Sequence, residues 1–412
     1  LLLTDRQLSA HGLILGASGA GKSTTLLTIL TDRIRRGLPV VAIDLKGSPA
    51  FAGELAAAAE AAGRSFRVWT PDGPSYWNPL QHGNATELKD KLIGAERFTE
   101  PHYQRAAERY VQTVFQVLEH AYPERTPTID QVVRLMDPRL MSSMLRHVPR
   151  QLSERVQDYL AGLTPDQLSA IRGLGTRLAI ISESHTGQYL SPAAGEERRA
   201  IDLRRALAGD EVVLFSLNSS TYGKLSAQLG TLVVQDLIAA SGHRLGRRDL
   251  GADADAALPA MVGIDEFSAL GSDHVVSLLA RSRGAGVSVI LATQELADLD
   301  RAAPGLRDQV LGNTAVKIAH RQDVPASAQT IAQMAGTQKV WEHTFATGNP
   351  LVTGFHTGRG TRRQVEQFVI HPNEIKGLRT GQAVVLAKLP SATARTVRVS
   401  APTRPPRGLE LG

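Results

Sequence analysis

The feature that most constrains the fold of this chain is a glycine-rich segment between an apolar stretch and a helical pattern. It has the spacing G-x-x-x-x-G-K-[ST], and its residues are Gly16, Ala17, Ser18, Gly19, Ala20, Gly21, Lys22, Ser23 and Thr24. Glycines let successive backbone N–H groups point into one hollow, and the helix that follows adds partial positive charge at its N-terminus. Such a loop needs a strand before it and a helix after it. The apolar run 13–15 and the helical pattern 22–36 supply both.

The segment predicts a phosphate-binding loop for ATP and Mg²⁺, with all nine residues in contact with the nucleotide. We expect Lys22 to reach the β- and γ-phosphates and Ser23 to ligate Mg²⁺. The alternative is a glycine-rich turn with a solvated lysine, which the flanking strand and helix disfavour.

Short apolar runs alternate with helical stretches on both sides of a central block. Alternation of this kind predicts a parallel sheet with helices on its faces. The expected strands lie at 13–15, 40–44, 66–69, 211–216, 260–265, 287–291, 315–318 and 383–386.

The central block, from about Glu87 to Ser182, shows only helical periodicity. Within it, Thr164, Pro165 and Gln167 form a helix-start signal. The predicted fold class is α/β with a mostly parallel central sheet and an inserted all-α domain. The expected divisions are a nucleotide-binding domain at 1–86 and 196–400, the all-α insertion at 87–195, and a frayed tail at 401–412. We expect a loop at 242–258, which is rich in Gly, Asp, Ala and Arg.

An acidic pair ends the strand predicted at 260–265. A phosphate-loop ATPase needs a carboxylate for Mg²⁺ and a base for the attacking water, both at the end of a buried strand near the loop. Asp265 is therefore expected to hold Mg²⁺, mostly through water, and Glu266 to polarise the lytic water. The alternative is that both residues only cap the next helix.

Three further polar residues are candidates for catalysis. Gln294 follows the strand 287–291, where an amide could sense the γ-phosphate; the alternative is a surface helix cap. Arg281 and Arg283 are candidates for an arginine that stabilises transition-state charge in a neighbouring subunit of a ring, and surface solvation is an equal alternative.

Composition restricts the class of protein without identifying it. The 412 residues carry 46 Lys and Arg against 40 Asp and Glu, a net charge of +6 with a pI near 9.6, which permits a polyanionic partner. With no cysteine, a disulfide scaffold, a thiol nucleophile and a Cys-ligated metal are excluded. No apolar run is long enough to span a membrane. The sequence begins at Leu1 rather than Met, so we expect a natural N-terminal segment to be missing.

The combination of these motifs resembles the type IV coupling proteins, the TraG/TraD-type DNA-transfer ATPases. The likeness covers about residues 11–389 and includes the phosphate loop, Asp265 with Glu266, the Gln294 strand, the helical block and the turn Trp77-Asn78-Pro79-Leu80. The strand end Asp44-Leu45-Lys46-Gly47 is similar to the family's aspartate-proline-lysine-glycine motif, with Leu45 in place of proline. The resemblance places Asp44 and Lys46 in the nucleotide site.

The resemblance also implies a mechanism and partners. Members of this family are hexameric, RecA-like motors that use ATP to deliver DNA, relaxase-bound DNA or effector proteins to a type IV secretion channel. They act at the cytoplasmic side of the bacterial inner membrane, usually tethered by N-terminal transmembrane helices, so we expect a missing membrane anchor here. The helical block matches in position the domain thought to receive the substrate.

Two alternatives stay open. One is a double-stranded DNA translocase of the FtsK or HerA type; the Pro-rich C-terminus leaves no room for the winged-helix module expected of an FtsK-type motor. The other is an ATP-gated assembly protein of the secretion channel, which would not need the base Glu266. Arginine clusters at 198–205, 244–248 and 359–363 are candidate DNA contacts, and no aromatic-interleaved stacking platform stands out.

Overall fold

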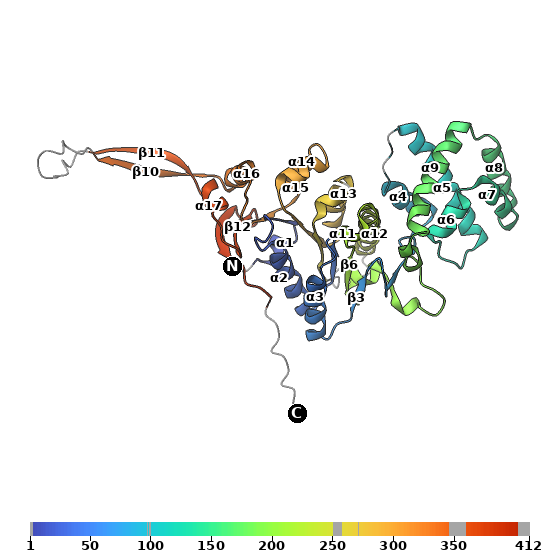
Figure 1. The fold of residues 1–412 in the computed structure, drawn as a ribbon, viewed down its shortest axis with the longest axis horizontal. Helices are drawn as coiled ribbons and strands as arrows, with labels where there is room; N and C mark the ends of the chain where they lie inside the picture. Colours follow the sequence, from blue (N-terminus) through green and yellow to red (C-terminus); the bar gives the residue numbers. More distant parts are fainter. Residues whose placement is uncertain are drawn as a thin grey trace, which may run out of the picture.

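A computed structural model describes residues 3–96, 98, 100–249, 258–270, 272–345 and 360–402. A central α/β body carries a helical block at one end and a two-stranded arm at the other (Figure 1). Among the described residues, no helix is long and apolar enough to cross a membrane. The tail predicted at 401–412 lies outside the described residues from 403 onward.

The body is built on one nine-stranded sheet. Seven neighbouring strands are parallel, and two antiparallel strands, β12 and β13, extend the edge beside β9. All eight strands predicted from the sequence are present, which confirms the α/β class with a mostly parallel sheet. In spatial order the strands are β13 (Thr393–Arg398), β12 (Gln382–Ala387), β9 (Val316–Ala319), β1 (Gly12–Leu15), β8 (Val287–Thr293), β7 (Ala260–Asp265), β2 (Val40–Asp44), β6 (Val212–Ser216) and β3 (Phe66–Trp69).

Helices cover both faces of this sheet, because the central strands are apolar on both sides. One face packs against α1 (Asp5–Leu8), α2 (Lys22–Arg35) and α3 (Pro49–Ala61). The other face packs against a larger group of helices and shares one apolar core with the helical block. These helices are α10 (Leu203–Ala208), α12 (Lys224–Asp249), α13 (Ser272–Ser282), α14 (Leu296–Ala302), α15 (Leu306–Asn313), α16 (Pro325–Ala335) and α17 (Pro372–Lys376).

The helical block begins after the short strand β4 (Tyr76–Trp77) and returns to the body at β5 (Ala200–Ile201), which pairs with β4. The predicted start of its last long helix is present: Thr164 caps the helix, and Gln167 bonds back to the Thr164 N–H. Its helices are α4 (Ala85–Gly94), α5 (Pro101–Ala121), α6 (Ile129–Leu135), α7 (Pro138–Met144), α8 (Arg150–Ala161) and α9 (Pro165–Ser182). The domain boundaries named above stay a prediction.

The loop predicted at 242–258 is wrong over its first half. Helix α12 continues to Asp249, and residues 250–257 lie outside the described part of the chain. The Nε of Arg244 donates to the carbonyl of Ala285 (2.9 Å), and Leu245 packs on the apolar core. These long-range contacts outweigh the low helix propensity of Gly242 and Gly246, each of which costs the helix about 1 kcal/mol.

A buried ion pair joins the helical block to the body. Lys91 on α4 reaches Asp236 on α12 at 2.7 Å, and both side chains are buried. The Lys91 ammonium also donates to the carbonyls of Pro79 and His82, and the Trp77 indole donates to the other Asp236 oxygen at 3.1 Å. The Asp236 carboxylate is thus held by β4 and by the first helix of the block, and the turn between them holds the Lys91 ammonium.

The arm is a feature that the sequence did not reveal. It consists of β10 (Thr337–Phe345) and β11 (Gly360–Phe368), antiparallel over nine residue pairs. The Val369 N–H closes its root by donating to the carbonyl of Gly336 (2.9 Å), and Phe368 packs on the core there. The arm leaves the body at the sheet end opposite the helical block (Figure 1).

Candidate nucleotide site

The phosphate loop connects β1 to α2, as the motif predicts. Gly19 and Gly21 have φ angles of 72° and 110°, in the left-handed region that side chains with a Cβ rarely adopt. At Gly21 a Cβ would also lie only 3.3 Å from the backbone nitrogen of Gly381. Ser18 and Gly19 are exposed at the crest of the loop, whereas Lys22 behind it is buried. Both glycines are therefore required for the shape of the loop.

Two other segments hold the loop in place. The Ala17 N–H donates to the carbonyl of Arg321 (3.0 Å), just after β9. Gly381 and Thr380 lie just before β12. The Gly381 N–H donates to the carbonyl of Ala20 (3.1 Å), and the Thr380 hydroxyl donates to the carbonyl of Gly19 (3.3 Å). The loop is thus fixed from the β9 and β12 side of the sheet.

His320 was missed by the sequence reasoning. It is fully buried beneath the loop, where a Cβ on Gly16 would approach its Cβ to 3.0 Å. Its Nδ1 lies 2.8 Å from the carbonyl of Gln382, which can only accept, so Nδ1 carries the proton and Nε2 accepts from the Thr25 hydroxyl at 2.8 Å. Burial lowers the pKa of His320 and keeps it neutral. The feature of the sequence that could have identified His320 is its position directly after a core strand, like the position of Gln294.

The structure brings the predicted acidic residues to one edge of the sheet. The strand order β1-β8-β7-β2 places the ends of four parallel strands side by side, and Asp44 and Asp265 are register partners. The Ser23 hydroxyl donates to Asp265 Oδ2 at 2.8 Å. The two residues predicted to hold Mg²⁺ therefore already contact each other.

Glu266 lies at the centre of the polar contacts in the site. Its Oε1 is 2.6 Å from the ammonium of Lys22 and 2.7 Å from that of Lys46, and it accepts from the Gln294 amide at 3.2 Å. Four predicted site residues, separated by up to 272 positions along the chain, thus meet at one carboxylate oxygen.

The electrostatic balance keeps Glu266 ionised. Burial alone would raise the pKa of this carboxyl, but the hydrogen bonds and charges of Lys22 and Lys46 outweigh it and hold the pKa below its ordinary value. Burial also opposes the charge on Lys46, yet Glu266 and the nearby aspartates raise the Lys46 pKa. The Glu266 backbone has φ 57°, a left-handed conformation that costs a non-glycine residue about 1 kcal/mol or more.

Asp44 has a different environment. Its side chain accepts from the backbone N–H groups of Lys46 (2.9 Å) and Ser48 (2.6 Å), which shape the turn after β2. Burial, and to a smaller extent the charge of Asp265, raises the pKa of Asp44. Its hydrogen bonds make Asp44 the residue that positions Lys46.

Arg281 and Arg283 are not brought into this site. Both are exposed near the end of α13, at the edge where β8 begins. Because β8 is parallel to β1, this edge is opposite the one that carries the phosphate loop. An action of either arginine on a neighbouring subunit stays a prediction.

The residues present fit a nucleotide with Mg²⁺. The exposed crest of the loop offers backbone N–H groups, the buried Lys22 supplies positive charge, and Ser23 and Asp265 are hard oxygen ligands of the kind Mg²⁺ takes together with substrate phosphates. Mg²⁺ bound there would neutralise charge that develops on the phosphates. Glu266, ionised and beside Lys22, is placed to accept a proton from water.

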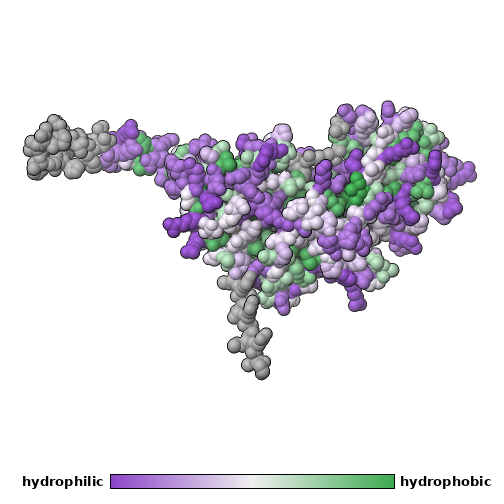
Figure 2. All heavy atoms as spheres, viewed as in Figure 1, coloured by the Kyte–Doolittle hydropathy of each residue, from purple (hydrophilic) through white to green (hydrophobic). Residues whose placement is uncertain are grey.

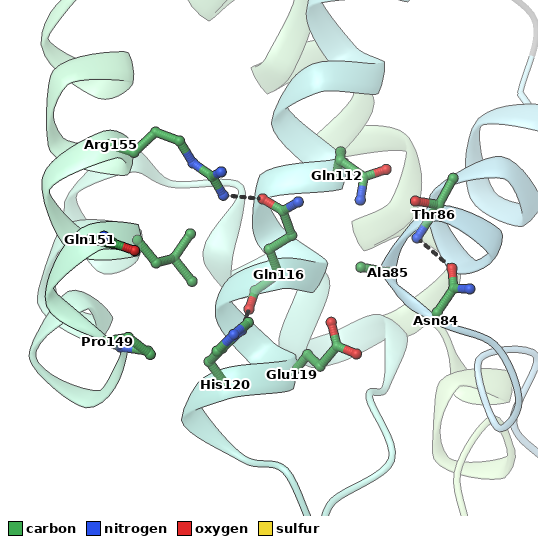
Figure 3. Close-up of a pocket in the computed structure, with 11 residues that line it drawn as sticks. Asn84, Ala85, Thr86, Gln112, Gln116, Glu119, His120, Pro149, Gln151 and Arg155 are labelled. Carbon is green, nitrogen blue, oxygen red and sulfur yellow. Dashed lines mark hydrogen bonds between the residues drawn. The ribbon is translucent and has the colours of Figure 1, made fainter.

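A separate hollow of about 460 Å³ lies in the helical block, between the start of α4, the second half of α5 and α8. Its lining is mostly polar, and the guanidinium of Arg155 donates to the Gln116 amide oxygen at 2.9 Å (Figure 3). Ligand pockets of this volume are usually lined by apolar side chains. This hollow therefore does not resemble a small-molecule site.

The second part of the chain matches a known family. Residues 259–380 match the family model described as the TraM recognition site of TraD and TraG. This region runs from β7 to the segment before β12, so it contains Asp265, Glu266 and Gln294 as well as the arm. The comparison with curated proteins finds no significant match.

Solved structures share the fold over nearly the whole chain. The bacterial conjugative coupling protein TrwBdeltaN70, in its unbound form, matches with a TM-score of 0.70 at 14% identity, covering 97% of this chain and 87% of that one. TrwB in complex with ADP and Mg²⁺ matches with a TM-score of 0.67 at 14% identity, over 98% and 88%. VirB4 of Thermoanaerobacter pseudethanolicus matches with a TM-score of 0.55 at 14% identity, over 96% and 90%.

Proposed function

We infer that this chain is a type IV coupling protein of the TraG/TraD type, an ATP-hydrolysing motor that links a DNA substrate to a conjugation or secretion channel. The family model covers the strand that carries Asp265 and Glu266, and the shared fold extends over the helical block and the phosphate loop. TrwB structures with ADP and Mg²⁺ and with a non-hydrolysable ATP analogue agree with ATP and Mg²⁺ as the ligands.

The observation that carries the proposal is the convergence on Glu266. Hydrolysis by a positioned water requires an ionised carboxylate at the end of a buried strand beside the phosphate loop. Glu266 meets this requirement, since it lies 2.6 Å from Lys22 of the loop. A protein that only bound ATP need not retain such a base.

The geometry suggests how the site changes when it acts. Lys22 is engaged by Glu266 in this state, so it must leave Glu266 to neutralise a phosphate. That exchange frees one hydrogen-bonding position on Glu266 Oε1 for water. Lys46 is not part of the phosphate loop and can stay on Glu266. We assign Lys46 a positioning role in this state.

A chain of contacts connects the hydrolytic strand to the helical block. Helix α13 follows Glu266 closely, and its His274 Nδ1 lies 2.8 Å from the Gln235 amide of α12. The same amide donates to the carbonyl of Gly94 at the end of α4 (3.3 Å). A substrate held by the helical block could act on ATP turnover through these contacts.

Partners and assembly complete the proposal. A motor of this kind works as a homo-hexamer, with Arg281 or Arg283 available to act in trans and with relaxase or effector proteins and channel subunits as partners. We also propose that it works at the cytoplasmic face of the membrane. The family description favours a recognition surface for a TraM-like protein within residues 259–380.

Stimulation of ATP turnover by DNA tests the function. We expect turnover to rise severalfold with single-stranded DNA and less with duplex DNA of equal length, because the motor works on its substrate. A larger response to duplex DNA would favour the translocase of the FtsK or HerA type. Turnover indifferent to both would favour the channel-assembly alternative and reject the motor.

A further inference from the structure

The described part of the arm has two different faces. Alternation along β10 and β11 places Lys339, Trp341, His343 and Arg362 on one face, with Gln364 opposite Trp341 and Glu366 opposite Lys339. The other face carries Val340 and Val365 and the Glu342–Arg363 ion pair at 2.9 Å. Around Trp341 and Arg362 the first face is therefore basic and aromatic, and its acidic residue Glu366 lies toward the root of the arm.

Trp341 is the central residue of the first face. Its side chain is 48% exposed although the Arg362 guanidinium lies 4.2 Å from its ring centroid. The two residues are diagonal neighbours across the hairpin, since Gln364 is directly opposite Trp341. With Arg362 over one face of the indole, the remaining exposure leaves an aromatic surface beside a fixed positive charge.

We propose that this face of the arm, Trp341 with Arg362, is a stacking site for an unpaired base of single-stranded DNA, with Lys339 and Arg362 near its phosphates. The site rests on the proposed function, which supplies the DNA. Proteins that hold single strands without reading sequence combine aromatic platforms with cationic side chains in this way. The sequence separates Trp341 from Arg362 by 20 residues, so this platform is visible only in the structure.

A protein partner fits this face less well. Stable protein interfaces bury on the order of 1,000 Å² or more, with an apolar centre. The side chains next to Trp341 on its face are polar, whereas Val340 and Val365 lie on the other face. Phe368 shares the face of Trp341 but packs on the core at the root of the arm. On the side of the arm that Figure 2 shows, hydrophilic residues surround a smaller hydrophobic patch. A nucleotide base of DNA, by contrast, needs only one aromatic surface to stack on and one positive charge near its phosphate.

Fluorescence of the full-length chain tests this site directly. The chain has three tryptophans, and Trp69 and Trp77 are fully buried, so Trp341 is the one exposed to quenchers. We expect oligothymidylate to quench its emission, duplex DNA to quench it far less, and added salt to weaken the effect. Unchanged emission at saturating oligothymidylate would overturn the proposal.

Matched variants locate the contact. Binding of labelled oligothymidylate should weaken about tenfold in Trp341→Ala and roughly threefold in Arg362→Ala, while Trp341→Phe keeps most of the affinity. The control is Arg363→Ala, since Arg363 belongs to the same candidate cluster, 359–363. Because Arg363 lies on the other face of the arm and pairs with Glu342, this variant should bind DNA like the parent. Equal losses in both arginine variants would overturn the assignment of the face.

Two outcomes distinguish a failure of the proposed arm site from a failure of the proposed function. ATP hydrolysis that depends on Glu266, with Trp341 emission indifferent to DNA, would reject the arm site and leave the motor in place. Binding through Trp341 without ATP hydrolysis would support the arm site and reject the motor. If Trp341 emission instead changed with protein concentration in the absence of DNA, the face would contact a second copy, and the proposal would be wrong.

Discussion

Glu266→Gln is expected to lower ATP turnover by about 100-fold or more. Gln keeps the size and the hydrogen-bonding oxygen of the side chain but cannot accept a proton from water. Lys22 and Lys46, which now share Glu266 Oε1 at 2.6 and 2.7 Å, would lose a charged partner. Nucleotide binding should persist or strengthen, because Lys22 no longer has to leave a carboxylate to reach a phosphate.

The measurement is steady-state phosphate release, with nucleotide affinity determined in parallel. Lys22→Ala is the matched control, since it removes the charge that neutralises the phosphates and should abolish binding itself. If Glu266→Gln kept an ATP turnover within about threefold of that of the parent, this turnover would be too high for an enzyme that has lost its catalytic base. The assignment of Glu266 would then be refuted.

The second large effect is on stability, at the junction of the helical block and the body. Lys91→Met and Asp236→Asn should each lower the free energy of unfolding by about 3–5 kcal/mol, because each leaves a buried charge without its partner. Lys91 is 4% exposed and its ammonium lies 2.7 Å from Asp236 Oδ1. In Asp236→Asn the Trp77 indole can still bond to the amide oxygen, but the amide NH2 group then faces the Lys91 ammonium, so Lys91 loses a hydrogen-bond acceptor as well as an opposite charge.

Urea denaturation followed by circular dichroism measures these changes. Arg150→Met is the control: it removes an ion pair with Glu154 of the same length, 2.7 Å, but at an exposed position. It should cost no more than about 0.5 kcal/mol. The double variant Lys91→Met with Asp236→Asn should cost less than the sum of the two single changes. Single variants as stable as Arg150→Met would show that the pair does not hold the junction.

The sequence predicted the parts of the site that depend on local patterns. The phosphate loop is contiguous, and the parallel-sheet rule places Asp44, Asp265 and Gln294 at one edge once their strands are recognised. Lys46, expected at the nucleotide, lies on Glu266 as Lys22 does, so its contact with the nucleotide stays a prediction. The turn after β2, which Asp44 shapes, sets the position of Lys46.

Two of the features that the sequence did not reveal depend on long-range pairing. Lys91 and Asp236 are 145 residues apart, and Thr25 and His320 are 295 apart. Each partner looks like an ordinary helix or loop residue until the fold brings the two together. The arm was missed for a different reason: its two strands lie close in the sequence, on either side of residues 346–359, but neither has the apolar pattern of a core strand. The first half of the loop predicted at 242–258 proved helical because Arg244 and Leu245 contact the body.

We propose that ATP hydrolysis at Glu266 moves DNA. The release of streptavidin from the end of a biotinylated single strand in the presence of the full chain tests this directly. We expect release to require ATP, to be absent with a non-hydrolysable analogue, and to be lost in Glu266→Gln while DNA binding remains. Release that is the same with ATP, with the analogue and in Glu266→Gln would show that hydrolysis at Glu266 does not move DNA.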